Sequence, residues 1–341
     1  MQVLGVNGGN GVLLHKLKPF LVGNYEPRQD FYIKNTTLAW DCNFPNILQT
    51  KDFEHLKNYL GDKRVDVIIG CPDCGHSSVM SYSRIKRLSN PLGNDSLQRY
   101  FEAIRYFQPK IFFFENLPTL LKQLPLEYIK DSVPGYKLKI FMDSVSVWGN
   151  SQITRKRLVI IGVKTEAFKA IKVYLKLPSK ESYKLKRVKE LEYAYRSPNI
   201  AICHVRESKN KVVCIEKDFK KLKLWQVREE WLRTGNKNWD ARTTGKGKMI
   251  TLPGVYRNLP NHYPRTVRPA SRQFNSRGYM MTPRELAAIN GIPDDFILYY
   301  DPEKHSLCIN KAMVTAAKTA PYEMGTWFSK ILLKLYRKGL V

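Results

Sequence analysis

The sequence has few cysteines, no long apolar run and a shortage of acidic side chains. Six cysteines occur at irregular intervals along 341 residues: Cys42, Cys71, Cys74, Cys203, Cys214 and Cys308. This spacing argues against a disulfide framework, because small disulfide-bonded domains contain dense and regular cysteines. Since no stretch of roughly eighteen residues is both apolar and uncharged, we expect no membrane-spanning helix. The first residues, MQVLGVNGGNGVLLHKL, lack the basic and apolar regions of a secretory signal, which favours a cytoplasmic protein.

The charge of the chain is strongly one-sided. Asp and Glu number 30 against 57 Lys and Arg, for a formal net charge of +27. Such a basic excess argues against an enzyme of small neutral metabolites and favours a polyanionic partner. The basic residues are concentrated between about residues 164 and 290, which weakens the alternative that they are generic solubilising charge.

The first half of the chain alternates apolar runs with helical patterns. Runs such as VDVIIG and KIFFFEN are typical of buried parallel strands, and DSLQRYFEAIRYF between them has helical periodicity. The predicted strands cover residues 1–6, 18–26, 65–70, 110–116 and 157–163. This order predicts an α/β fold with a doubly wound sheet, in which ligands bind beyond the carboxyl ends of the strands.

A change in residue composition near Lys164 predicts a second, smaller domain. Beyond it the sequence is Lys-rich, and Trp225, Trp231 and Trp239 suit the core of a small domain or base-stacking platforms. Helical patterning returns where Thr282 and Glu285 form a capping-box signature. The amphipathic segment 318–336 is expected to form a last helix. We therefore predict domains at 1–164 and 165–270, and a C-terminal segment at 271–341 that packs back on the first domain.

Two loops with reactive side chains follow predicted strands. GCPDCGHSS follows VDVIIG and contains Cys74, and ENLP follows KIFFF and contains Glu115. Both loops are expected at one crevice, because the strands of such a sheet end at the same edge. A thiolate and an acid suit attack on cytosine, since addition at C6 makes C5 nucleophilic and protonation of N3 prevents charge build-up. Arg155 and Arg157 alternate on entering the next strand, so we expect one face to present both to O2 of the base.

The order of these segments resembles that of the cytosine-C5 DNA methyltransferase family over nearly the whole chain. LGVNGG is similar to the family's Phe-x-Gly-x-Gly-Gly cofactor loop, GCPDCGHSS to its Pro-Cys-Gln loop, and ENLP to its Glu-Asn-Val motif. QITRKR resembles Gln-x-Arg-x-Arg, and RGYMMTPRELAAINGIPDDF resembles the Arg-x-Leu-Thr-x-x-Glu helix. The resemblance implies catalytic roles for Cys74, Glu115, Asn116, Arg155 and Arg157. It implies cofactor contacts by Leu4, Val6, Asn7, Gly8, Gly9, Glu26, Asp52, Phe53, Pro72 and Lys318.

The resemblance also implies a fold, a cofactor and a substrate. The expected fold is the Rossmann-like, S-adenosylmethionine-dependent version of the sheet, with a target-recognition domain at 165–270. The expected substrate is a cytosine flipped out of double-stranded DNA, because the reacting atom is hidden inside the duplex. Predicted DNA contacts lie mainly in the loop after the nucleophile: Ser77, Ser78, Ser81, Arg84, Lys86, Arg87 and Thr282. We expect a monomer without a metal, acting in the cytoplasm of a bacterial or phage-infected cell.

Departures from the family pattern bear on the chemistry. Leu4 and Val6 stand where the family has Phe and Gly, which predicts weaker stacking on adenine. Asp73 stands beside Cys74 where the family has Pro, and a nearby carboxylate disfavours a thiolate unless it points away.

A further departure lies near the C-terminus, where Lys318 replaces an Asn that normally lies close to the cofactor. Two unit positive charges about 5 Å apart repel by roughly 3 kcal/mol at an effective dielectric near 20. An anionic substituent on the transferred carbon would reverse the sign. We therefore hypothesise that the cofactor is carboxy-S-adenosyl-methionine and the product 5-carboxymethylcytosine. The alternative, that Lys318 turns toward solvent, a phosphate or the ordinary methionine carboxylate, stays open at this point.

The same residues allow other interpretations. Cys71 and Cys74 have the spacing of a redox pair, but they do not follow the first strand as in thioredoxin-type proteins, and Cys71 suits a packed interior. Cys203, His204 and Cys214 match no compact zinc motif. The same fold also acts on tRNA, in a branch whose characteristic Cys-Phe-Thr tripeptide is absent here. A catalytically silent DNA-binding relative is the third function class, against which the reactive residues argue.

Overall fold

The structure is a computed structural model in which two compact units are distinguished. It describes residues 1–26, 40–41, 43–73, 95–179, 183–187, 190–191, 283–297, 315–317 and 319–341, with seven shorter pieces at 205–206, 211–212, 241–243, 249–251, 255–257, 264 and 272–274. The first unit comprises Met1–Trp148, Lys156–Ser182 and Ala320–Val341. The second comprises Gly149–Arg155 and Tyr183–Thr319. The domain boundaries expected from the sequence stay a prediction.

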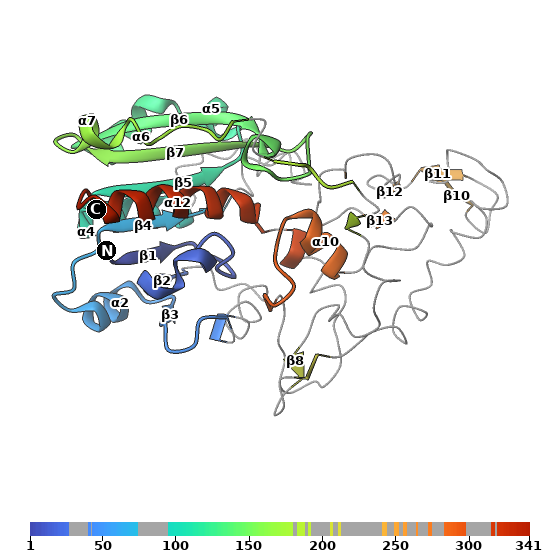
Figure 1. The fold of residues 1–341 in the computed structure, drawn as a ribbon, viewed down its shortest axis with the longest axis horizontal. Helices are drawn as coiled ribbons and strands as arrows, with labels where there is room; N and C mark the ends of the chain where they lie inside the picture. Colours follow the sequence, from blue (N-terminus) through green and yellow to red (C-terminus); the bar gives the residue numbers. More distant parts are fainter. Residues whose placement is uncertain are drawn as a thin grey trace. The chain divides into compact units, whose positions relative to one another are not determined.

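A seven-stranded sheet forms the centre of the first unit (Figure 1). Its strand order is β3-β2-β1-β4-β5-β7-β6, with β1, β2, β3, β4 and β5 parallel, and β7 antiparallel to both β5 and β6. The strands are β1 (Val3–Val6), β2 (Leu21–Tyr25), β3 (Gln49–Thr50), β4 (Val67–Gly70), β5 (Ile111–Asn116), β6 (Tyr136–Ser144) and β7 (Lys156–Lys164). After β3 the chain crosses back and places β4 on the other side of β1, as in a doubly wound sheet, so the predicted fold class is confirmed.

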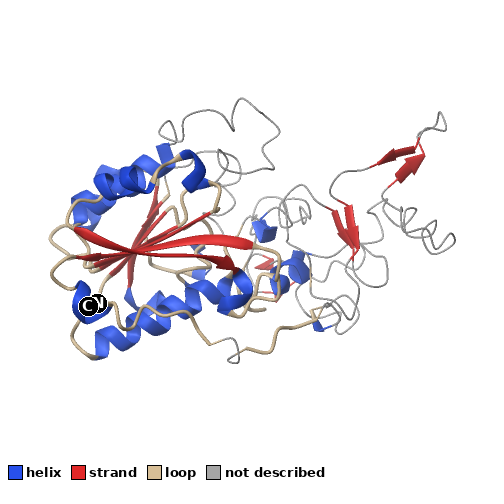
Figure 2. Ribbon diagram, turned by 90° about the horizontal axis from the view of Figure 1, so that it is seen from above, coloured by secondary structure: helices blue, strands red, loops and turns tan. Residues whose placement is uncertain are grey.

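Helices cover both faces of this sheet (Figure 2). They are η1 (His15–Phe20), α2 (Phe53–Leu60), α4 (Asp95–Phe107), α5 (Leu120–Gln123), α6 (Leu126–Ser132), η3 (Val145–Trp148), α7 (Phe168–Ile171) and α12 (Tyr322–Arg337). The predicted strand at 18–26 is thus shorter than expected, because its first residues belong to η1. Pro19 explains this difference, since proline lacks the N–H that a central strand needs.

The aromatic run of β5 supplies the two faces of the core. Phe112 and Phe114 belong to the cluster formed with α4, and the Phe114 ring lies 5.4 Å from that of Tyr100. Phe113 points to the opposite face, where its ring centre lies 4.6 Å from that of Phe328 on α12. Alternate residues of a strand face opposite sides, so one run of three phenylalanines anchors a helix on each face.

Tyr100 shows how the core accommodates a polar group. Its hydroxyl donates a hydrogen bond to the carbonyl of Phe113 at 2.7 Å. Burial raises the pKa of this phenol well above its ordinary value, so Tyr100 stays neutral and acts as a donor. The hydrogen bond fixes α4 against β5, two elements that lead into the site described below.

The second unit contains short paired strands and one helix with described bounds. β8 (Val205–Arg206) pairs antiparallel with β9 (Lys211–Val212), and β10 (Ala241–Thr243) pairs antiparallel with β11 (Met249–Thr251). β12 (Val255–Arg257) pairs in parallel with β13 (Arg272–Phe274), and α10 covers Pro283–Ile289. Proline is well suited to the first turn of α10, where its missing N–H costs nothing. Among the residues that the structure describes, no helix combines the length and the apolar character that crossing a bilayer requires.

Replacing Phe113 by alanine tests the packing of α12 on the sheet. Phe113 is fully buried, so Phe113→Ala is expected to lower the free energy of unfolding by about 3–5 kcal/mol. Met142→Ala is the control, because that side chain on the edge strand β6 is 57% exposed and should change stability by less than about 0.5 kcal/mol. Chemical denaturation measures both values, and equal losses in the two variants would contradict the packing argument.

Candidate active site

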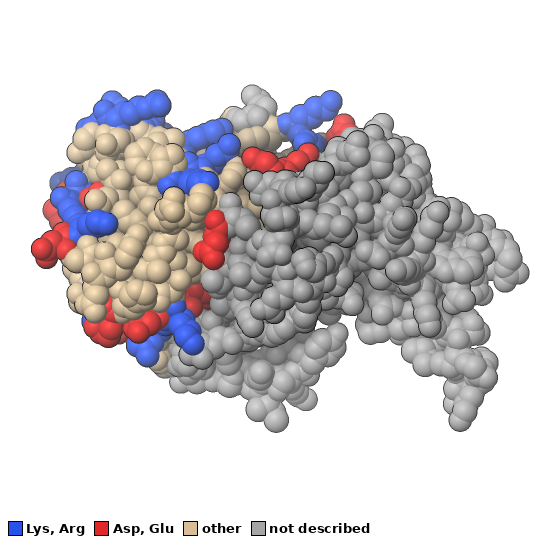
Figure 3. All heavy atoms as spheres, turned by 90° about the horizontal axis from the view of Figure 1, so that it is seen from below, with Lys and Arg blue, Asp and Glu red and all other residues tan. Residues whose placement is uncertain are grey.

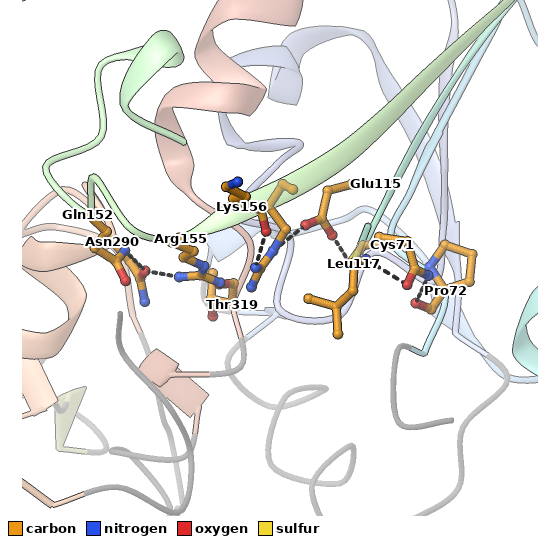
Figure 4. Close-up of polar contacts among 11 residues, drawn as sticks. Cys71, Pro72, Glu115, Leu117, Gln152, Arg155, Lys156, Asn290 and Thr319 are labelled. Carbon is orange, nitrogen blue, oxygen red and sulfur yellow. Dashed lines mark hydrogen bonds and ion pairs between the residues drawn. The ribbon is translucent and has the colours of Figure 1, made fainter. Parts of the chain in front are cut away.

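Glu115 is a buried carboxylate at the carboxyl end of β5. Its side chain is only 3% exposed, and its Oε1 lies 2.8 Å from Nε of Arg157. Its Oε2 accepts a hydrogen bond from the thiol of Cys71. A buried carboxylate needs such partners, because removing an unpaired charge from water is costly. Figure 4 shows Glu115 between Cys71 on one side and the segment of Lys156 on the other.

The strand order explains why these three side chains meet. β4 is parallel to β5 with Gly70 paired to Phe114, so Cys71 follows β4 next to Glu115. β7 is antiparallel to β5 with Glu115 paired to Val159, so Arg157 lies two residues away along the neighbouring strand. Glu115 therefore has one cross-strand partner on each side. The sequence predicts Glu115 and Arg157 as site residues, and the structure brings them together.

Cys71 is the residue that sequence reasoning missed. The expectation of a small hydrophobic side chain in a packed interior is wrong, since Cys71 is half-buried and its thiol donates a hydrogen bond to Glu115. The signal was available in principle, because Cys71 directly follows one predicted strand and Glu115 ends the next. The residues of the zinc alternative, Cys203, His204 and Cys214, lie outside the described residues, so the structure does not test that alternative. Within the described residues, no three His, Cys, Asp or Glu side chains gather as metal ligands would.

Asn116 holds the start of the predicted nucleophile loop. Its Nδ2 donates to the carbonyl of Pro72 at 3.1 Å, while its Oδ1 accepts from the N–H of Leu117 at 2.8 Å. Asn116 and Pro72 are both buried. One amide thus fixes the chain that leaves β4 against the chain that leaves β5.

A glycine-rich turn follows β1. Asn7 and Gly9 have positive φ angles of 57° and 56°, the left-handed conformation that Asn and Gly adopt most easily. Gly8 has a different constraint, because a Cβ there would lie 2.5 Å from Oδ1 of Asn24. The side chain of Glu26, which directly follows β2, accepts the N–H of Gly9 at 2.9 Å. The predicted glycine loop and the predicted ribose-binding acid are therefore in contact.

Other predicted cofactor residues have structural partners of their own. Asp52 is the N-cap of α2, and its Oδ1 accepts from the backbone N–H groups of Glu54 and His55. Phe53 is half-buried, with its ring 5.1 Å from that of Tyr25. Leu4 and Val6 are fully buried in the core, so both departures from the family pattern have a packing role. Cofactor contacts by these residues stay a prediction.

Comparison with known proteins identifies the family of this chain. The sequence pattern of the C-5 cytosine-specific DNA methylase family matches residues 22–320. This chain belongs to that family. The predicted resemblance is thereby confirmed, and the family supports methyltransferase activity at C5 of cytosine. No curated protein sequence matches the chain.

Several solved structures share the fold of this methylase. One is described as a DNA modification methyltransferase encoded within a prophage (E. coli), with a TM-score of 0.66, 18% identity and 99% of each chain covered. The Entamoeba histolytica methyltransferase EhMeth has a TM-score of 0.61 at 11% identity over 98% of each chain. The S. pombe Dnmt2 methyltransferase has a TM-score of 0.58 at 12% identity over 99% of each chain. These likenesses confirm the predicted Rossmann-like methyltransferase fold.

The second predicted arginine of the methylase, Arg155, belongs to a separate polar network. It is 2% exposed and precedes β7, which begins at Lys156, so it is not a strand residue as expected. Its guanidinium donates to the carbonyl of Thr319 at 2.9 Å and to Oδ1 of Asn290. Gln152 donates to the same Oδ1 at 2.7 Å (Figure 4). The described partners of Arg155 are thus protein groups, and its predicted contact with O2 of the base stays a prediction.

Several predicted site residues of the methylase lie outside the described residues. The predicted nucleophile Cys74, the predicted cofactor residue Lys318 and all predicted DNA contacts belong to this group: Ser77, Ser78, Ser81, Arg84, Lys86, Arg87 and Thr282. On the face drawn in Figure 3, basic and acidic side chains of the described part are interspersed. The excess of basic charge therefore does not form a single patch on that face of the described part.

Arg155 should contribute to the stability of the protein, whereas its exposed neighbour Lys156 should not. Arg155→Met removes the guanidinium donor from the carbonyl of Thr319 and one of the two described donors from Oδ1 of Asn290, so we expect a loss of about 2–4 kcal/mol in the free energy of unfolding. Lys156→Met is the matched control, because Lys156 is the exposed neighbour and should have almost no effect. Urea denaturation measures both. An unchanged stability of Arg155→Met would show that the network does not hold this part of the methylase together.

Proposed function

We propose that this methylase transfers a one-carbon group to C5 of a cytosine flipped out of duplex DNA, with Cys74 as nucleophile and Glu115 as acid. The observation that carries the proposal is the pairing of buried Glu115 with Arg157 and Cys71 at the carboxyl end of the central strand. In the sequence, Cys74 directly follows Asp73 and lies three residues beyond Cys71, the first residue after the neighbouring strand β4. A buried carboxylate with a specific charge partner is a feature of many catalytic sites.

The residues present fit an adenosyl cofactor. Glu26 is a buried carboxylate at the carboxyl end of β2, and it lies 17 residues after the glycine that it contacts. This position matches the acidic residue that binds ribose hydroxyls in dinucleotide-type folds. A Cβ at Gly9 would meet no atom within 4 Å, so the outer surface of the turn is open. When bound, the sulfonium cofactor supplies an electrophilic carbon.

The protein's own residues carry the remaining steps. The Cys74 thiolate adds to C6 of the base, Glu115 donates a proton to N3, and Arg157 stabilises the charge that develops beside O2. A bound cofactor would supply the carbon that C5 takes up, with the cofactor's sulfur as the leaving group. Loss of the C5 proton to a base, return of the N3 proton to Glu115 and expulsion of the Cys74 thiolate restore the aromatic ring. The pairing with Arg157 and Cys71 holds Glu115 in one orientation for proton transfer.

The nucleophile is tested by a covalent trap. Duplex DNA that contains 5-fluorocytosine should form a denaturation-resistant adduct with the wild type in the presence of cofactor, because the fluorine cannot leave as a proton does. Cys74→Ala should abolish the adduct and Cys71→Ala should retain it, with gel mobility or intact mass as the measurement.

The reverse pattern would show that Cys71 is the nucleophile. Substitution of 5-fluorocytosine RNA for DNA distinguishes the tRNA-directed alternative. A wild type without adduct on either nucleic acid would support the catalytically silent alternative.

The identity of the donor is a second open question, and Lys318 favours carboxy-S-adenosyl-methionine. Both chain neighbours of Lys318 are buried, with Ala317 4% exposed and Thr319 5% exposed. The sequence thus has a cation in a segment where the family has an uncharged side chain close to the sulfonium. A carboxylate on the transferred carbon would neutralise that cation. The proposed product with this donor is 5-carboxymethylcytosine.

Mass spectrometry of nucleosides decides the donor. Purified enzyme supplied with both donors and duplex DNA is expected to give 5-carboxymethylcytosine in excess over 5-methylcytosine. Lys318→Asn should reverse this preference by about tenfold or more, since a charge effect of about 1.4 kcal/mol already corresponds to a factor of ten. Production of 5-methylcytosine alone by the wild type would remove the role of Lys318 but leave methyl transfer intact.

A further inference from the structure

Ser96 is a buried hydroxyl at which three segments of the first unit meet. It is 5% exposed and lies one residue after the start of α4. Its Oγ accepts the backbone N–H of Asp73 at 2.9 Å and Nδ2 of Asn7 at 2.8 Å. The two donors are 23 and 89 positions away along the chain. Ser96 therefore connects α4 to the chain beyond β4 and to the glycine turn beyond β1.

These contacts differ from those of an ordinary helix cap. A serine at a helix start usually accepts the N–H groups of its own first turn. The two described hydrogen bonds that Ser96 accepts come instead from Asp73, in the chain that leaves β4, and from Asn7 in the glycine turn. Capping alone does not account for a hydroxyl that is held by two distant segments.

Asn7 is fixed independently of its side chain. Its backbone N–H donates to the carbonyl of Tyr25 at 2.7 Å, and its own carbonyl accepts from the N–H of Cys71 at 3.3 Å. The backbone of Asn7 thus connects β1 to the ends of β2 and β4, while its side chain contacts α4. A displacement of the glycine turn would therefore shift the hydrogen-bond partner of Ser96 and, through Ser96, the position of Asp73.

We infer that Ser96 is a positioning residue that couples cofactor binding to base binding. The inference rests on the proposed function, in which the glycine turn contacts the cofactor and the chain at Asp73 leads into the nucleophile. Without the hydroxyl, the partly buried N–H of Asp73 and the buried amide of Asn7 lose their common acceptor. Cofactor and DNA should then bind without the mutual strengthening that such a network provides.

The test measures this strengthening directly. S-adenosylhomocysteine, the product of either donor, is titrated into the full-length protein with and without duplex DNA that contains cytosine. The ratio of the two dissociation constants is the coupling factor. We expect a wild-type factor of at least about fivefold, since coupling between sites is typically of this size or larger. Ser96→Ala should bring the factor close to one, while Ser96→Thr, which keeps the hydroxyl, should preserve it.

Two further variants separate positioning from a general loss of structure. Ser132→Ala removes an exposed hydroxyl that bonds the carbonyl of Tyr128 on α6, and it should leave the coupling factor unchanged. Asn7→Gly removes the amide but permits the positive φ, so it should lower the factor as Ser96→Ala does. The double variant should lose no more than Ser96→Ala alone, because Asn7 acts through Ser96.

The possible outcomes are distinct. A coupling factor near one in the wild type, or one that Ser96→Ala leaves unchanged, would overturn the inference. Additive losses in the double variant would overturn it as well, because they would show that the two side chains act separately. The covalent trap with 5-fluorocytosine DNA reports on the proposed function by itself, so its failure is not confused with failure of the coupling. If Ser96→Ala does not fold, Asn7→Gly and Ser96→Thr give the same decision.

Discussion

The burial of one carboxylate is the constraint on which the rest of the site depends. Glu115 is 3% exposed, and a charge so enclosed is tolerated only with partners in fixed positions. The sheet supplies them through its topology, because a parallel strand and an antiparallel strand flank β5. The parallel neighbour leads to Cys71 and the antiparallel one contains Arg157. The antiparallel placement of β7 between β5 and β6 is therefore what allows an arginine to meet the acid at the carboxyl end of β5.

The sequence predicts the strands of the sheet better than it predicts the hydrogen bonds and ion pairs between side chains. The buried runs around Ile68, Phe113 and Ile160 are apolar on both faces, so their pattern identifies strands without ambiguity. β6 was missed because Tyr136–Ser144 lies at the edge, where exposed lysines alternate with half-buried residues. The pairing of Glu115 with Cys71, and of Arg155 with Asn290, joins residues that are 44 and 135 positions apart. Such pairings follow from strand order and loop paths, which local patterns do not specify.

The two neighbouring arginines illustrate why motif spacing is not sufficient to assign a role. Both stand in the segment that resembles the family's Gln-x-Arg-x-Arg, and spacing alone suggests a shared face. In the structure Arg157 pairs with the acid, whereas Arg155 donates to protein groups from two other segments. A guanidinium has a planar fork of donors that can tie several acceptors together. The same residue type therefore pairs with a buried carboxylate at one position and connects protein segments two residues earlier.

The polar groups around the glycine turn suggest how catalysis and cofactor binding are kept in register. Asn7, Asn116 and Ser96 each join two elements that leave the carboxyl edge of the sheet, and each is at most 5% exposed. Buried hydrogen bonds of this kind are specific because a partner that moves away leaves an unsatisfied group behind. The loops at the carboxyl edge of the sheet are therefore held to one another as well as to the sheet. A site of this construction loses alignment when a single acceptor is removed, even if every residue that touches the substrate is intact.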